Sequence, residues 1–213
     1  DAASPAKPLR DGALRGLRLV WARSFGMTKL RSPKPSRSLP QSLRRAHTEL
    51  FRGSCYFYII GAAAVLAEIP EPSEVALVQT RDVDIVPGIA EASEEDRIAN
   101  QIDWVLGEGS EFEVEHQYYA QGLSRSSPQY APSDWMLRAR PVMAGAYTGL
   151  CMEIHDLALS KFGAGRPKDL EFNAALARTG LLDKNELLAR LDQVEADSIL
   201  RQRIIDRIKA AFR

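Results

Sequence analysis

Hydrophobic and polar positions along the chain follow two different periods, which separates strand-like segments from helix-like segments. The run "CYFYII" predicts a buried strand, and Gly61 marks a tight turn into a helix over "GAAAVLAEI". After a proline-rich break, "TRDVDIV" predicts the next strand, and "ASEEDRIANQIDWVL" predicts a helix capped by Ser93. Three shorter strands are expected further along, in "EFEVEHQ", "QYYAQGLS" and "LRARPVMA".

The period becomes helical after Leu150 and stays helical to the end of the chain. Breaks at Gly163, at Gly165 and in "TGLLDKNE" divide this part into several helices. The last helix is expected to bury one face, which carries four isoleucines: Ile199, Ile204, Ile205 and Ile208. A mixed α/β part followed by a helical part is typical of the α+β class.

Charge is distributed unevenly along the chain. The 213 residues include 28 Lys and Arg and 28 Asp and Glu, so the net charge is zero, but residues 1–52 hold twelve basic and three acidic side chains. We expect residues 1–37, rich in Pro, Ser, Ala, Lys and Arg, to be a solvated and largely disordered tail, in preference to a nucleic-acid-binding arm or a transit peptide. The α/β core then spans 38–148, beginning with a helix over "SLPQSLRRAHTELF", and the helical region spans 149–213.

Cysteine usage and hydropathy exclude several classes of protein. The two cysteines, Cys55 and Cys151, and the three histidines show no zinc-ligand spacing. We expect both cysteines to be buried thiols, which is compatible with the reducing cytoplasm. The longest apolar run, 55–67, is too short to cross a bilayer, so no membrane partner is expected.

Two carboxylates one residue apart in "TRDVDIVPG" are the strongest candidates for chemistry. Because side chains alternate along a strand, Asp82 and Asp84 project from one face and Val83 and Ile85 from the other. Two carboxylates on rigid backbone repel each other unless a cation lies between them. Mg²⁺ (or Mn²⁺), which takes one or two carboxylates together with substrate phosphates, suits such a pair. The same pattern also occurs on solvated edge strands, so the surrounding sequence is needed to distinguish a metal site from a solvated strand.

That surrounding sequence is a strand, a glycine turn, a helix and a strand carrying the aspartate pair, the organisation of DNA polymerase beta-like nucleotidyltransferases. With "YIIGAAAVL", "LGEGSEF", "APSDWMLRARPV" and the helical block from "IHDLALSKFGAGRPKDL" onward, the chain resembles a bacterial nucleotidyltransferase-like family related to AbiEii-type abortive-infection toxins. The resemblance covers roughly residues 55–191. It implies a small mixed nucleotidyltransferase-type sheet with flanking helices, followed by a C-terminal helical bundle.

The resemblance implies roles for residues at matching positions. Gly61 and Ala62 would form the turn that faces a triphosphate, and Asp82 and Asp84 would be catalytic metal ligands. The nucleotide would also be held by four basic side chains: Arg81, Lys161, Arg166 and Lys168. For the helical residues, a helix corner held by ion pairs with Asp169 is an equal alternative, and Asp156 is expected to cap its helix.

A third catalytic carboxylate is expected from a neighbouring strand. Glu113, which would share a strand face with Glu115, is the candidate. If "QYYAQGLS" is the matching strand instead, the position holds Gln121, a neutral group that binds metal poorly. The Gly61-Ala62 turn also departs from the Gly-Gly or Gly-Ser of active nucleotidyltransferases, and the loss of serine removes a phosphate-binding hydroxyl.

Two functions from different classes remain open. The first is a cytoplasmic, Mg²⁺-dependent nucleotidyltransferase that transfers a nucleoside monophosphate from NTP to a hydroxyl of RNA, such as tRNA, or of protein. The resemblance to toxins then implies a toxin-type component with a cognate antitoxin-like partner protein. The second is a protein of the same fold that has lost catalysis and acts as a nucleotide-binding or protein-binding regulator.

Overall fold

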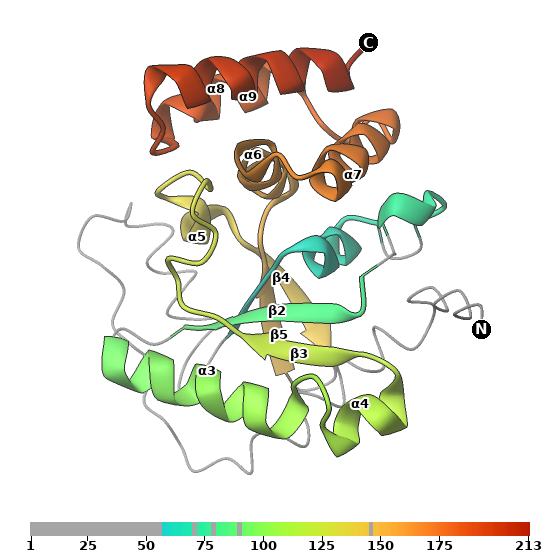
Figure 1. Ribbon diagram of the computed structural model, residues 1–213, viewed down its shortest axis with the longest axis vertical. Coiled ribbons are helices and arrows are strands. Elements are labelled where there is room, and N and C mark those ends of the chain that lie inside the picture. Colours follow the sequence, from blue (N-terminus) through green and yellow to red (C-terminus); the bar gives the residue numbers. More distant parts are fainter. Residues whose placement is uncertain (1–56, 70–71, 78–79, 89–90, 145–146) are drawn as a thin grey trace.

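The computed structural model describes residues 57–69, 72–77, 80–88, 91–144 and 147–213. The expected N-terminal tail, the helix expected within 38–51 and Cys55 therefore lie outside the described residues. Figure 1 shows a central sheet between two helical layers, with α3 (Ala92–Leu106) and α4 (Glu111–His116) on one side and the later helices on the other.

Among the described residues, five strands form one mixed sheet in the order β3-β2-β1-β5-β4. The strands are β1 (Phe57–Ile60), β2 (Asp82–Pro87), β3 (Tyr119–Gly122), β4 (Arg140–Ala144) and β5 (Tyr147–Cys151). Strand β1 pairs antiparallel with β2 and parallel with β5, while β2 and β3 are parallel and β4 and β5 antiparallel. This mixed sheet with flanking helices agrees with the predicted α+β class.

Short helices connect the strands, and longer helices follow them. Within the α/β part these are η1 (Ala62–Ala67), η2 (Val75–Leu77) and α5 (Trp135–Arg138), in addition to α3 and α4. After β5 the chain forms α6 (Ile154–Ala164), α7 (Pro167–Arg178), α8 (Lys184–Arg190), η3 (Leu191–Gln193) and α9 (Ser198–Ala211). None of the helices in the described ranges has the length and apolar character that crossing a bilayer would require.

Helix α3 covers the face of the sheet that carries Val83 and Ile85, both buried. Gly122 on β3 lies opposite Ile85, and a Cβ there would meet the Ala99 carbonyl oxygen of α3 at 2.0 Å. Only glycine therefore allows the helix to approach the strand this closely. On the other, second face of the sheet, η1 contacts β1, β2, β4 and β5, and α6 packs against η1.

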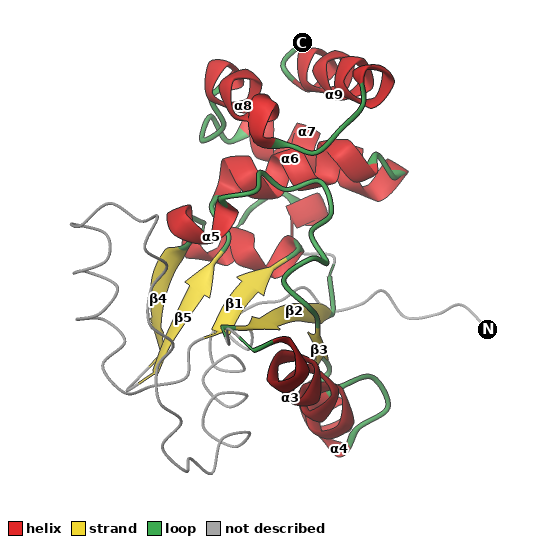
Figure 2. Ribbon diagram, turned by 90° about the vertical axis from the view of Figure 1, so that its left-hand side faces the viewer, coloured by secondary structure: helices red, strands yellow, loops and turns green. Residues whose placement is uncertain are grey.

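The helices after β5 pack against one another on the side of the sheet away from α3 (Figure 2). Helix α6 ends at Gly165, whose φ of 63° is left-handed, at one of the predicted breaks. Helix α9 buries Ile204 and Ile208 completely, and Ile205 in part. Ile199 in the first turn is 65% exposed, so the isoleucine face is buried only along the later part of the helix.

Three local predictions differ from the structure, and one strand is missing from them. The segment "EFEVEHQ" is the helix α4 rather than a strand, because Ser110 caps its N-terminus by accepting a hydrogen bond from the Glu113 amide. The helix predicted after Gly61 is a 3-10 helix, η1, and α3 begins after Glu91 without a side-chain cap, so Ser93 is not its cap. Strand β5 was not predicted, because its residues do not alternate clearly between apolar and polar.

Candidate functional site

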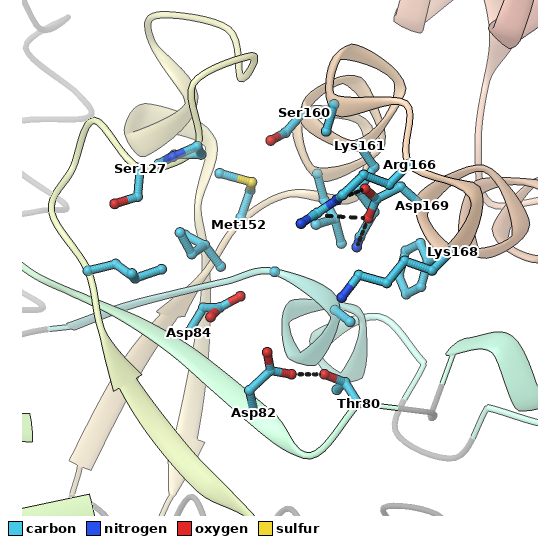
Figure 3. A pocket seen from close by; sticks show the side chains of 18 of the residues that line it. Thr80, Asp82, Asp84, Ser127, Met152, Ser160, Lys161, Arg166, Lys168 and Asp169 are labelled. Carbon is cyan, nitrogen blue, oxygen red and sulfur yellow. Dashed lines mark hydrogen bonds and ion pairs between the residues drawn. The ribbon is translucent and has the colours of Figure 1, made fainter. Parts of the chain in front are cut away.

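A cavity of about 460 Å³ lies between the second face of the sheet and the helices α6 and α7 (Figure 3). Seven of the residues predicted for the site line it: Gly61, Ala62, Asp82, Asp84, Lys161, Arg166 and Lys168. They come from segments about a hundred residues apart in the chain. The cavity therefore brings together the two halves of the predicted site, acidic on the sheet and basic on the helices.

The acidic wall is formed by Asp82 and Asp84 on β2. Their side chains project from the same face of the strand, opposite to Val83, and Figure 3 shows them directed toward the cavity. The Thr80 hydroxyl donates a hydrogen bond to Oδ1 of Asp82. Burial first, and then the negative charge of Asp82, raise the pKa of Asp84 to about 6 against the opposing effect of nearby cations. The pair thus carries negative charge that the protein does not fully neutralise.

The turn at Gly61 forms the part of the sheet wall next to this pair. Gly61 has a φ of 64°, a left-handed conformation that favours glycine, and Ala62 begins η1 directly after it. Strand register places Ile60, the residue before the turn, opposite Asp84. The end of β1 therefore holds the turn against the aspartate on β2.

The basic wall is organised around Asp169, a fully buried carboxylate in the first turn of α7. Nζ of Lys161 donates to its Oδ1 at 3.1 Å, and Nε of Arg166 donates to its Oδ2 at 2.6 Å. Burial lowers the pKa of Lys161, whereas the charge of Asp169 opposes this effect. The ion-paired helix corner that the sequence offered as one alternative is therefore present, and its cations also line the cavity.

Lys168 differs from the other two cations of this wall. It is exposed, it lines the cavity, and within the described part of the chain its ammonium forms no ion pair. Its positive charge lowers the pKa of Asp84, which shows that its field reaches the aspartate pair. Lys168 is therefore available to an anionic ligand without first breaking an ion pair with any described residue.

Glu113 and Arg81, the other two predicted site residues, lie outside the cavity. Glu113 accepts hydrogen bonds from Nη2 of Arg81 at 2.6 Å and from the Gly109 amide at 2.7 Å. The prediction of Glu113 as the third carboxylate requires its segment to be a strand beside β2. Because the segment is the helix α4, its carboxylate lies outside the cavity and does not complete a set of three acids.

The strand beside β2 is instead β3, which supplies Gln121. Gln121 is paired in parallel register with Asp84 and lines the same cavity. This is the alternative that the sequence left open, with a neutral amide at the position next to the pair. Other lining residues carry no local signal in the sequence: Thr80, Ser127, Met152, Ser160, Glu171 and Phe172.

The side chains that line the cavity offer few ligands for a divalent cation. No group of three or more His, Cys, Asp or Glu side chains able to hold a metal ion occurs among the described residues. Two carboxylates are nevertheless enough for Mg²⁺ when phosphate oxygens complete its shell. Burial, and after it the charge of Asp82, raise the pKa of Asp84, and a bound cation would oppose both effects. The residues therefore fit a cation that binds together with a phosphate ligand, rather than a metal centre made by protein alone.

A second charged cluster lies outside the cavity and joins α5, α6 and α8. Asp156 is fully buried and accepts hydrogen bonds from Arg138 at 2.8 Å and from Arg190 at 2.9 Å. The prediction that Asp156 caps α6 is wrong, because Glu153 is the N-cap residue. The cluster has its carboxylates paired with arginines, so its evident role is to fix these helices relative to one another.

Comparisons with family models, with curated proteins and with solved structures find no match to this chain.

Proposed function

We propose that this protein is a Mg²⁺-dependent nucleotidyltransferase that transfers a nucleoside monophosphate from NTP to a hydroxyl of RNA or protein. One observation supports the proposal above all: the aspartate pair on β2 faces three basic side chains of α6 and α7 across a single cavity. A nucleoside triphosphate has the matching chemistry, because its phosphate chain needs cations along one side and a carboxylate-bound metal ion on the other. On this proposal the sheet is of the nucleotidyltransferase type.

The reaction assigns a task to each wall. The acceptor oxygen forms a bond to the α-phosphorus, the bond from this phosphorus to the bridging oxygen of the β-phosphate breaks, and pyrophosphate leaves. The acceptor proton passes to solvent through the open side of the cavity. Lys161, Arg166 and Lys168 stabilise the charge that develops on pyrophosphate. A bound Mg²⁺ would neutralise the α-phosphate oxygens, and Asp82 and Asp84 would hold it there.

Labelled nucleotides provide the direct test. The purified chain is incubated with α-³²P-labelled NTPs, Mg²⁺ and either tRNA or a protein extract, and label in macromolecules is measured. We expect transfer by the wild type and a loss of about 100-fold or more in the double variant Asp82→Asn and Asp84→Asn. Asp192→Asn, at an exposed carboxylate on η3 outside the cavity, is the matched control. Transfer that persists in the double variant would disprove the proposal.

The sequence resemblance extends the proposal to biological partners. On this view the protein is a cytoplasmic toxin-type component that modifies tRNA or another RNA, and an antitoxin-like protein neutralises it. Induced expression in a bacterial host should then arrest growth, whereas the double aspartate variant should not. If the wild type and the double variant both arrested growth, the toxicity would not depend on nucleotide transfer.

A second candidate function is that of a nucleotide-binding regulator without catalysis. The observation in its favour is Gln121, a neutral amide paired in register with Asp84 where a third carboxylate is expected of an active enzyme. Calorimetry distinguishes the two functions: a regulator binds NTP with Mg²⁺ but gives no labelled product with any acceptor.

A further inference from the structure

We infer that the cavity binds one divalent cation rather than two, and that Gln121 sets this limit by occupying the place of a third anionic ligand. The inference rests on the proposed function, because it concerns the cation that accompanies a nucleoside triphosphate. It goes further by assigning the number of ions and the residue responsible for it.

The position of Gln121 follows from the strand register. In the parallel pair β2–β3, Asp84 lies opposite Gln121 and Asp82 lies opposite Tyr119. Residues opposite each other in neighbouring strands project from the same face, so the Gln121 side chain belongs to the same wall as the two aspartates. All three of these side chains line the cavity, with Gln121 exposed to solvent. Its amide oxygen can contribute a dipole to a cation, but no charge.

No other carboxylate in the described ranges joins the pair. Asp169 lines the cavity, but its oxygens accept hydrogen bonds from Lys161 and Arg166. Glu171 also lines the cavity, but it belongs to α7 in the opposite, basic wall. Consistently, the described residues contain no group of three acids, histidines or cysteines that could hold a metal ion. The sheet wall therefore supplies two negative charges.

Two charges neutralise one divalent cation. Sites with two metal ions hold them about 3.5–4 Å apart, where their mutual repulsion must be offset by several anionic ligands. Here the opposite wall is basic and adds repulsion for any second cation. A single ion neutralises the two aspartates and the basic wall faces the triphosphate, whereas a second ion would lack an anionic protein ligand.

The limit has a functional consequence. A single ion can hold the triphosphate, but no second ion is available to activate the acceptor hydroxyl. The wild type should therefore hold its nucleotide well and transfer it slowly. A carboxylate in place of Gln121 should create the second ion site and increase transfer.

Counting bound Mn²⁺ tests the inference without relying on activity. The full chain is titrated with Mn²⁺ in the presence of a non-hydrolysable NTP analogue, and free Mn²⁺ is measured by electron paramagnetic resonance. We expect one tightly bound ion in the wild type and two in Gln121→Glu. Gln121→Ala adds no charge, and Glu171→Gln removes the carboxylate of the basic wall other than Asp169. Both variants should still bind one Mn²⁺ ion. Thermal melts establish that each variant is folded, and Gln121→Asp replaces Gln121→Glu if the longer acid does not fold.

The outcomes separate this inference from the proposed function. Two ions in the wild type would overturn the single-ion inference but leave nucleotide transfer standing, and a fall to one ion in Glu171→Gln would then identify Glu171 as the extra ligand. A folded acidic variant that still binds one ion would likewise overturn it. If neither the wild type nor any variant binds Mn²⁺ with the analogue, the proposed function itself fails.

Discussion

A Cβ atom on Gly61 would lie 1.9 Å from Oδ2 of Asp84. The turn after β1 thus packs closely against the aspartate on β2, and this position needs a glycine for two reasons. It adopts a φ of 64°, and it leaves room for the carboxylate that lines the cavity.

Gly61→Ala should therefore destabilise the protein by about 2–4 kcal/mol, because left-handed backbone strain adds to a clash with Asp84. Gly109→Ala separates the two effects, since Gly109 has a φ of 81° but no atom within 4 Å of the added Cβ. It should cost only about 1 kcal/mol. Urea unfolding measures both values. Equal losses in the two variants would show that the clash contributes nothing.

Asp84→Asn should make the ligand-free protein more stable at neutral pH. The pKa of Asp84 in the folded protein is about 6, above the ordinary value of 3.8, so the folded state holds its proton more tightly. The stability due to the protonated acid is fully present below about pH 4 and is lost as pH rises through 6. We expect the variant to gain about 1–3 kcal/mol over the wild type at pH 7.5 and nothing near pH 4.

Unfolding at several pH values in EDTA measures this difference. Because the charge of Asp82 also raises the pKa of Asp84, the loss of stability should occur at lower pH when Asp82→Asn is present. A stability difference between Asp84→Asn and wild type that does not change with pH would contradict the assigned electrostatics.

Asp169→Ala should be strongly destabilising, by about 3–5 kcal/mol, because it leaves the largely buried Lys161 cation without its carboxylate partner. The matched control is Asp192→Ala, which breaks an ion pair with Arg201 in which Asp192 is 90% exposed. That change should cost less than about 1 kcal/mol. Chemical unfolding compares the two. Similar losses of stability in the two variants would mean that the buried carboxylate of Asp169 is no more important to the fold than an exposed one.

Lys168→Gln should weaken nucleotide binding without reducing stability. Lys168 lines the cavity with no ion pair among described residues, so its charge is free for a phosphate group. Loss of one charge-assisted contact corresponds to about 10- to 100-fold in Kd for an NTP analogue with Mg²⁺. Lys209→Gln, an exposed lysine on α9 outside the cavity, should leave Kd unchanged. Unaltered affinity in Lys168→Gln would remove this lysine from the proposed site.

Local sequence patterns determined the parts of this protein that depend on neighbouring residues. Alternation along β2 placed Asp82 and Asp84 on one face, glycine at position 61 predicted the turn, and the helical period predicted α3 at its observed bounds. A short amphipathic segment is ambiguous between strand and helix, and this is why α4 was mistaken. Its Ser110-x-x-Glu113 pattern, a common N-terminal helix signal, was the evidence that favoured helix.

Only the tertiary structure decided which residues meet. Strand register, a long-range relation, placed Gln121 rather than Glu113 beside Asp84. The packing of α6 and α7 over the sheet brought Lys161, Arg166 and Lys168 to the aspartates. No local period encodes such distances, because side-chain periodicity fixes the direction of a residue within its own element. The partner across a cavity depends on how separate elements bury their apolar faces against each other.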